Sequence, residues 1–317
     1  MRRLIECVPN FSEGRDHKKI EALVGAMSGI KGARVLDLHS DPDHNRSVVT
    51  LAGEPEPVAQ AVLRGVGTAA ELIDLRLHRG EHPRIGATDV LPFVPVEGVT
   101  MENCVALARQ TGQQIWARYK VPVYFYEEAA LRPERKRLES VRSGEFEYLR
   151  DEVLRNADRA PDIGGPRLHP SAGAVAIGAR KFLIAYNINL DAPDVSVAKK
   201  IARTIRASNG GLPYVKAIGV ELKDRKIAQV AINITDFEQT SIRRVFETVR
   251  LEAERNDCSI LSSEIVGLVP RNALGPDDAA YLQLENFVPA QKILESRLET
   301  RTNEEAPDSI SLPSIGS

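Results

Sequence analysis

Two stretches of this chain carry the same order of expected secondary structure, and this repetition constrains the fold more than any other feature. In residues 4–96 the hydrophobic pattern predicts a strand, a helix, two strands, a second helix and a final strand. Residues 182–269 repeat that order, with a hairpin-like turn at 223–225. This succession is the split β-α-β pattern of ferredoxin-like folds. We therefore predict an α+β protein of two related subdomains, with mixed or antiparallel sheets packed by helices.

The length of 317 residues accommodates two such subdomains, which we place at 1–178 and 179–300. Acidic and basic residues alternate between Arg132 and Arg159, so this stretch is interpreted as solvated helix rather than a nucleic-acid-binding patch. The tail, residues 301–317, is rich in Ser, Pro and Glu and is predicted to be disordered.

Composition and missing motifs exclude several function classes. A net charge of −2 gives no bulk attraction to nucleic acid or to anionic membranes, and no apolar run is long enough to span a bilayer. The three cysteines are far apart, which argues against a disulfide framework or thiolate zinc site and indicates a reducing cytoplasm. The sequence contains no P-loop, no GxGxxG and no GxSxG motif. A cytoplasmic protein with small-molecule partners is expected.

His82 is the candidate catalytic residue. Its side chain has an unperturbed pKa near neutrality, and Pro83 disfavours helical geometry before it, which predicts an imidazole held on a loop. Arg76, Arg79 and Arg84 lie nearby in the sequence and suit an anionic ligand. The alternative is a solvated basic loop with an incidental histidine.

The run from Asp162 to Ala174 is rich in glycine and proline and cannot form a regular helix or strand. It lies where the two predicted subdomains meet. Two interpretations remain open for this run, a segment that covers a ligand cleft and a plain interdomain linker.

Two further polar groups admit alternative interpretations. A metal cluster at residues 39–44 is disfavoured, because Pro42 interrupts it and alternation aims its side chains apart; a polar loop with Asn45 and Arg46 reaching a ligand is favoured. Asparagines at the ends of predicted strands either cap turns or bind a heterocycle edge or carboxylate. They are Asn187, Asn189 and Asn233.

Three segments, taken together and in order, resemble the glutamate formimidoyltransferase family. They are Glu6–Gly14, Gly80–Ala87 and Gly178–Leu190, and the resemblance extends over residues 3–297. It implies two α/β subdomains around an electropositive folate tunnel, and a homodimer. It also implies transfer of the formimino group from N-formimino-L-glutamate to N5 of tetrahydrofolate, which yields glutamate and 5-formiminotetrahydrofolate in histidine degradation.

The resemblance assigns the catalytic histidine to His82, tetrahydrofolate as co-substrate and no metal. The folate-contacting segment falls on Gly164, Gly165, Pro166, Arg167, Leu168, His169, Pro170, Ser171, Ala172 and Gly173. A carboxylate, either Asp37 or Asp89, can stabilise the cationic amidine, and Arg46, Arg79 and Arg84 are the candidates to bind the carboxylates of formiminoglutamate and folate polyglutamate. The wider candidate set is Asn10, Asp37, His39, Asn45, Arg46, Arg79, Arg84, Asp89, Asn187, Asn189 and Asn233.

The chain departs from some animal relatives of that family. They carry a fused cyclodeaminase, which this sequence is too short to contain, and they have an aspartate at His39 and a tryptophan at Ala172. Two other functions remain alternatives, a 5-formyltetrahydrofolate-dependent one-carbon transferase and a non-catalytic folate-binding protein. An RNA-binding module is disfavoured by the aromatic content of 5% and the near-neutral charge.

Overall fold

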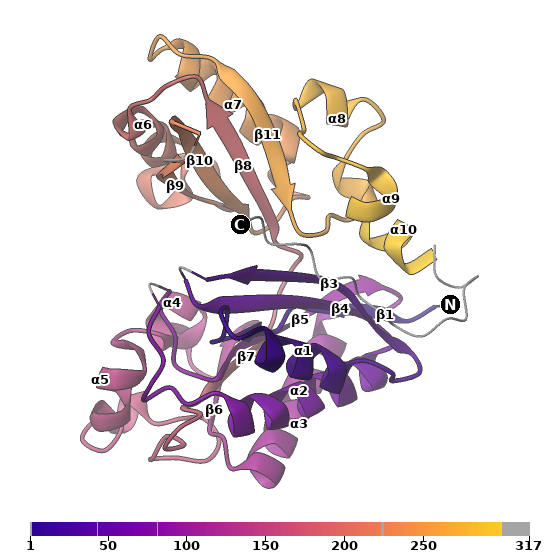
Figure 1. The fold of residues 1–317 in the computed structure, drawn as a ribbon, viewed down its shortest axis with the longest axis vertical. Helices are drawn as coiled ribbons and strands as arrows, with labels where there is room; N and C mark the ends of the chain where they lie inside the picture. The colour runs from indigo at the N-terminus through magenta and orange to yellow at the C-terminus, as the bar shows by residue number, and fades with distance from the viewer. Residues whose placement is uncertain (1, 43, 81, 223–224, 300–317) are drawn as a thin grey trace. The chain divides into compact units, whose positions relative to one another are not determined.

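The computed structural model describes residues 2–42, 44–80, 82–222 and 225–299. Within them the chain divides into two compact units, the first ending at Arg180 and the second beginning at Lys181. Each unit has its own β-sheet and its own helices (Figure 1). No helix of the described ranges is both long and apolar enough to cross a membrane.

The first unit is built on a seven-stranded sheet in the order β3-β4-β1/β2-β5-β7-β6. Both β1 and β2 pair with β4 on one side and with β5 on the other, so they form one interrupted strand. Strand β7 pairs in parallel with β5 and β6, whereas the other pairings are antiparallel. The strands are β1 (Leu4–Cys7), β2 (Asn10–Phe11), β3 (Ala33–Asp41), β4 (Arg46–Gly53), β5 (Thr88–Glu97), β6 (Val123–Glu127) and β7 (Val175–Ala179).

Three helices pack on one face of this sheet (Figure 1). They are α1 (His17–Met27), α2 (Pro55–Leu72) and α3 (Met101–Tyr119). Helix α1 begins where the Asp16 side chain accepts bonds from two backbone N–H groups. Of the apolar residues that the sequence spaces along one face of this helix, Ile20, Leu23 and Met27 are buried and Val24 is half-buried. The hydrophobic pattern did not predict α3, β6 and β7. These elements extend the ferredoxin-like core, with β7 and β6 added beyond β5.

The interpretation of residues 132–159 as solvated helix is wrong in part. The segment folds into short elements that bury Val141, Phe146 and Leu149, whereas Tyr148 and Leu154 are exposed. Arg135 is buried as well, and its guanidinium binds the carboxylate of Asp162 over 2.6 Å. The elements are η1 (Pro133–Arg135), α4 (Leu138–Val141), α5 (Glu145–Glu152) and η2 (Ala157–Arg159).

The second unit repeats the core of the first. Its antiparallel sheet has the order β11-β8-β10-β9, which matches β5-β1-β4-β3 strand for strand and confirms the prediction of two related α+β subdomains. Helices α6 and α7 pack on one face of the sheet (Figure 1). The elements are β8 (Ile184–Leu190), α6 (Val195–Ile205), β9 (Val215–Leu222), β10 (Ile227–Ile234), α7 (Ile242–Glu254) and β11 (Ile260–Val266).

The expected strand end at Asn187 is wrong, because Asn187 lies in the middle of β8, whereas Asn189 and Asn233 are each one residue from a strand end as expected. Strand β8 pairs with β10 and β11 through Asn187 and Asn189, so its ladder continues to Leu190. Residues 223–224 of the expected turn and the tail at 301–317 lie outside the described residues. Short helical elements complete the unit: η3 (Ala207–Asn209), η4 (Arg271–Ala273), α8 (Asp278–Tyr281), α9 (Pro289–Lys292) and α10 (Leu294–Glu299).

Candidate active site

His82 lies on the loop between α2 and β5, and one backbone bond fixes its tautomer. Its Nδ1 is 2.8 Å from the carbonyl oxygen of Pro83. A carbonyl oxygen only accepts, so Nδ1 must carry the proton of this bond. In the neutral ring, Nε2 then holds a free lone pair and can accept a proton from a ligand.

The surroundings of His82 keep that ring neutral. Burial, followed by the charges of Arg46 and Arg142, lowers the pKa of His82 to about 4, while Asp89 and the bond to Pro83 oppose the shift. The ring of His44 meets His82 edge-on, with centroids 6.0 Å apart. At neutral pH the half-buried imidazole is therefore a proton acceptor rather than a cation.

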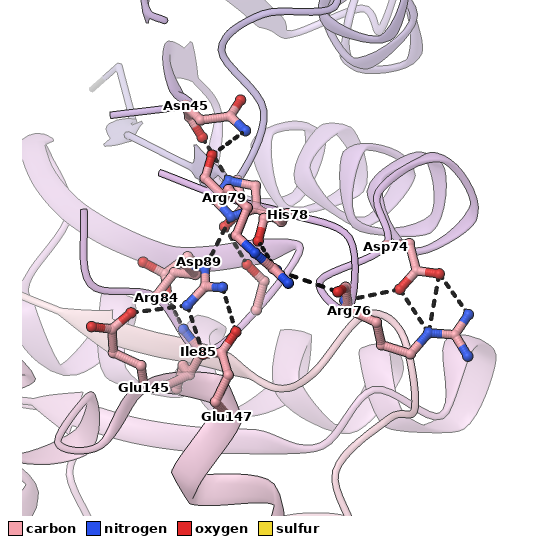
Figure 2. Close-up of polar contacts among 12 residues, drawn as sticks. Asn45, Asp74, Arg76, His78, Arg79, Arg84, Ile85, Asp89, Glu145 and Glu147 are labelled. Atoms are coloured by element: carbon pink, nitrogen blue, oxygen red, sulfur yellow. Dashed lines mark hydrogen bonds and ion pairs between the residues drawn. The ribbon is translucent and has the colours of Figure 1, made fainter. Parts of the chain in front are cut away.

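Asp89 connects the His82 loop to the segment after α4. One carboxylate oxygen, Oδ1, accepts a bond from the backbone N–H of Ile85 over 2.8 Å (Figure 2), and Oδ2 pairs with a terminal nitrogen of Arg142. Asp89 is buried at the start of β5. Sequence reasoning missed Arg142, because it stands in a run of alternating charges and its partner is 53 residues away.

Arg46, the first residue of β4, is close enough for its charge to act on the His82 ring. A terminal nitrogen of Arg46 donates to the amide oxygen of Asn10 on β2. Burial and the nearby Arg142 lower the pKa of Arg46 to about 10, so it stays charged at neutral pH. In the described part of the chain, the buried Nε atoms of Arg46 and Arg142 have no hydrogen-bond partner. Two charged donors near His82 thus keep unused hydrogen-bonding capacity.

Arg84 is the centre of an internal cluster that holds the loop (Figure 2). Its terminal nitrogens bind Glu147 over 2.7 and 2.9 Å and Glu145 over 2.9 Å. Its Nε donates to Nδ1 of His78 over 3.0 Å, and Nε2 of His78 donates to the backbone oxygen of Asn45 over 2.9 Å. Carboxylates of the protein therefore occupy the guanidinium of Arg84, which is itself buried.

Asn45 continues this cluster towards β2. It has a φ of +48° and is buried. Its amide nitrogen donates to the backbone oxygen of Arg79 over 2.9 Å, and its amide oxygen accepts from Gly14 over 2.9 Å. Arg79 is exposed, and its Nη1 donates to the backbone oxygen of His78 over 2.7 Å. Hydrogen bonds of Asn45 thus connect its own loop to the loop that contains Gly14 and the loop that contains Arg79.

The structure brings the segment Gly164–Gly173 beside the His82 loop. Gly173 pairs with Gly86, and the backbone N–H of Ala87 donates to the oxygen of Ala172 over 2.9 Å. Ala172 and Gly173 are buried, as is Leu168. The exposed members of the segment are Gly165, Pro166, Arg167 and Pro170, and the half-buried ones are Gly164, His169 and Ser171.

The remaining candidates of the first unit lie on β3 and the turn after it. Asp37 is half-buried and His39 is exposed. Nε2 of His44 is 3.8 Å from Asp41. Asp43 lies outside the described residues, and among those that are described no three His, Cys, Asp or Glu side chains are grouped to hold a metal ion.

In the second unit, the amides of β8 form a chain of hydrogen bonds. Asn189 is fully buried; it donates to Ser262 over 3.0 Å and accepts from Gln229 over 2.9 Å. Asn187 donates to Glu264 over 2.9 Å. Asn233 is exposed on β10. The buried amide of Asn189 therefore links neighbouring strands by hydrogen bonds, whereas the side chain of Asn233 is accessible to solvent.

The sequence is similar to known proteins along most of its length. Residues 4–180 match the formiminotransferase domain, N-terminal subdomain, and residues 185–298 match the formiminotransferase domain. A glutamate formimidoyltransferase of Streptococcus pyogenes serotype M1 is 45% identical, covering 94% of this chain and 99% of that protein. One of Thermoplasma acidophilum is also 45% identical, covering 95% and 99%. A formimidoyltransferase-cyclodeaminase of Mus musculus is 44% identical, covering 90% of this chain and 54% of that protein.

Proposed function

The chain belongs to the formiminotransferase family, and we propose that it uses His82 to transfer the formimino group of N-formimino-L-glutamate to N5 of tetrahydrofolate. It is a group-transfer enzyme of histidine degradation, with tetrahydrofolate as its co-substrate. The observation that supports the role of His82 is the Nδ1–H bond to Pro83, which leaves Nε2 of a neutral ring free to accept a proton.

The reaction requires the net transfer of one proton from N5 of tetrahydrofolate to the glutamate nitrogen. The N5 lone pair of tetrahydrofolate attacks the formimino carbon, and a tetrahedral centre forms with a surplus proton on N5. Nε2 of His82 takes this proton and then delivers it to the glutamate nitrogen, while the bond between that nitrogen and the formimino carbon breaks. General acid–base help of this kind typically contributes about 10²- to 10⁴-fold to the rate. Orientation of both substrates contributes much of the rest.

The other site assignments form part of the same proposal. Gly164–Gly173 contacts the folate, since its backbone is paired with the segment that follows His82. Arg46 binds substrate. Arg84 and Asn45 hold the loop, because their polar groups bind other parts of the chain. We also propose a cytoplasmic homodimer that accepts folate polyglutamates, with subdomains at 1–178 and 179–300.

A spectrophotometric assay for 5-formiminotetrahydrofolate tests this function. We expect His82→Ala to lower kcat by about 10²- to 10⁴-fold with folate affinity retained. His17→Ala, an exposed histidine on α1, is the matched control. Turnover of His82→Ala close to that of the native chain would remove His82 from the mechanism. Side-by-side assays with 5-formyltetrahydrofolate as donor distinguish the alternative transferase.

A further inference from the structure

Two guanidinium groups near His82 keep hydrogen-bond donors that the described side chains do not use, even though the carboxylates of Asp89 and Asp41 lie near Arg46. Arg142 is paired with the carboxylate of Asp89, whereas the hydrogen-bond partner of Arg46 is the neutral amide of Asn10. Each guanidinium also keeps a buried Nε–H donor without a partner in the described part of the chain. Buried charged donors without partners are costly, so this arrangement favours an anionic ligand.

We propose that Arg46 and Arg142 together bind the α-carboxylate of the formimino donor beside His82. This proposal rests on the proposed function and adds to it a subsite and a residue, Arg142, that binds substrate. Paired guanidinium donors suit a carboxylate, because its two oxygens can each accept a charge-assisted hydrogen bond.

The position of the pair next to His82 selects the α-carboxylate among the carboxylates of the two substrates. In N-formimino-L-glutamate the α-carboxylate is attached to the same carbon as the departing nitrogen, which His82 must protonate. The γ-carboxylate lies further along the side chain. The carboxylates of tetrahydrofolate lie at the opposite end of that molecule from N5. A subsite beside the proton carrier therefore fits the α-carboxylate best.

Binding at this subsite changes the basicity of His82. Among the described residues, the titratable and charged groups that act on or meet the ring are Arg46, Arg142, Asp89 and His44. In the free protein, burial and the two guanidinium charges lower the pKa of His82. A bound carboxylate offsets those charges and raises that pKa, so His82 becomes a stronger base when the donor is in place.

Three donors test the assignment. N-formimino-L-glutamate has both carboxylates, N-formiminoglycine has only the α-carboxylate, and N-formimino-4-aminobutyrate has only the other one. We expect Arg142→Gln to lower kcat/KM about 10- to 100-fold for the first two donors and to leave the third nearly unchanged. Arg46→Gln should give the same pattern. The control is Arg118→Gln, an exposed arginine on α3.

The comparison between donors also separates binding from folding. A misfolded fraction lowers the rate with all three donors by the same factor, so an equal loss would overturn the proposal. A loss confined to the donors that contain the γ-carboxylate would assign the arginines to that group instead. Arg142→Lys, which keeps the charge, should recover part of the loss with the α-carboxylate donors.

A measurement without turnover distinguishes the subsite from the reaction. We expect L-glutamate to raise the pKa of His82, followed by NMR of the imidazole, and 4-aminobutyrate, which lacks the α-carboxylate, to have little effect. In Arg142→Gln the effect of L-glutamate should be lost. A native chain that forms no 5-formiminotetrahydrofolate would contradict the proposed function, whereas a His82 pKa unmoved by L-glutamate would contradict the subsite.

Discussion

The Nε of Arg84 donates a hydrogen bond to Nδ1 of His78 over 3.0 Å, and this bond fixes the protonation state of a buried imidazole. The ring proton must then reside on Nε2, which donates it to the backbone oxygen of Asn45. Burial lowers the pKa of His78, and the charge of Arg84 adds to the shift. A second proton on the ring would place two donors face to face, so the cluster requires neutral His78.

His78→Ala should destabilise the fold. The substitution leaves the buried Nε–H of Arg84 and the carbonyl of Asn45 without their shared partner. Each unsatisfied buried group costs about 1–3 kcal/mol, so we expect the free energy of unfolding to fall by about 2 kcal/mol or more. Urea denaturation at pH 7.5 measures the change. His17→Ala is the matched control, and an equally small effect of both variants would contradict the role of this cluster.

Mild acid should destabilise the protein before its carboxylates titrate. Burial lowers the pKa values of His78, His82 and His169 in the folded chain, while in the unfolded chain they titrate near 6.5. As the pH falls through about 6.5, the unfolded state takes up protons that the native state does not, so the free energy of unfolding decreases. Denaturation midpoints between pH 7.5 and 5 check this sign; an increase in stability over that range would refute it.

Two substitutions should move the pKa of His82 in opposite directions. Arg142→Gln removes a neighbouring cation, and we expect the pKa to rise from about 4 towards the ordinary value. Asp89→Asn removes a carboxylate that favours the charged ring, so the pKa should fall further. NMR titration of the imidazole follows both variants. Shifts of the same sign would mean that a change in burial, rather than charge, dominates.

The sequence predicted the duplicated core, because hydrophobic periodicity is local. The face of Ile20, Leu23 and Met27 is an example, since spacing along one helix determines which side is buried. Arg142 was missed because its role depends on Asp89, which reaches it only through tertiary contact. The central position of Asn187 in β8 was missed for a similar reason, since the backbone of β8 pairs with two distant strands up to Leu190.

Gly173 joins the proposed folate segment to the His82 loop, and any side chain there should separate them. Its φ is +68°, and an added Cβ would lie 2.1 Å from the backbone oxygen of Ile85. Gly210 has a φ of +82° but nothing within 4 Å of such a Cβ. The two glycines therefore share the left-handed conformation and differ in the close contact.

We expect Gly210→Ala to cost only the conformational strain, about 1–2 kcal/mol. Gly173→Ala should cost more and should also raise the Kd for tetrahydrofolate. Thermal unfolding and fluorescence titration with folate measure the two effects. Equal destabilisation by both variants, with folate affinity unchanged, would mean that the contact between Gly173 and Ile85 does not position the segment.

Asn189 and Asn233 separate the two interpretations of the asparagines in the second unit. Asn189→Ala removes the partner of the Gln229 amide and of Ser262 in a fully buried chain of bonds, so we expect a loss of about 1–3 kcal/mol in the free energy of unfolding. Asn233 is exposed on the same sheet, and Asn233→Ala should change stability by less than about 0.5 kcal/mol. Because only an accessible amide can bind substrate directly, weaker folate binding in Asn233→Ala at unchanged stability would support a binding role. Unchanged affinity would exclude Asn233 from the site.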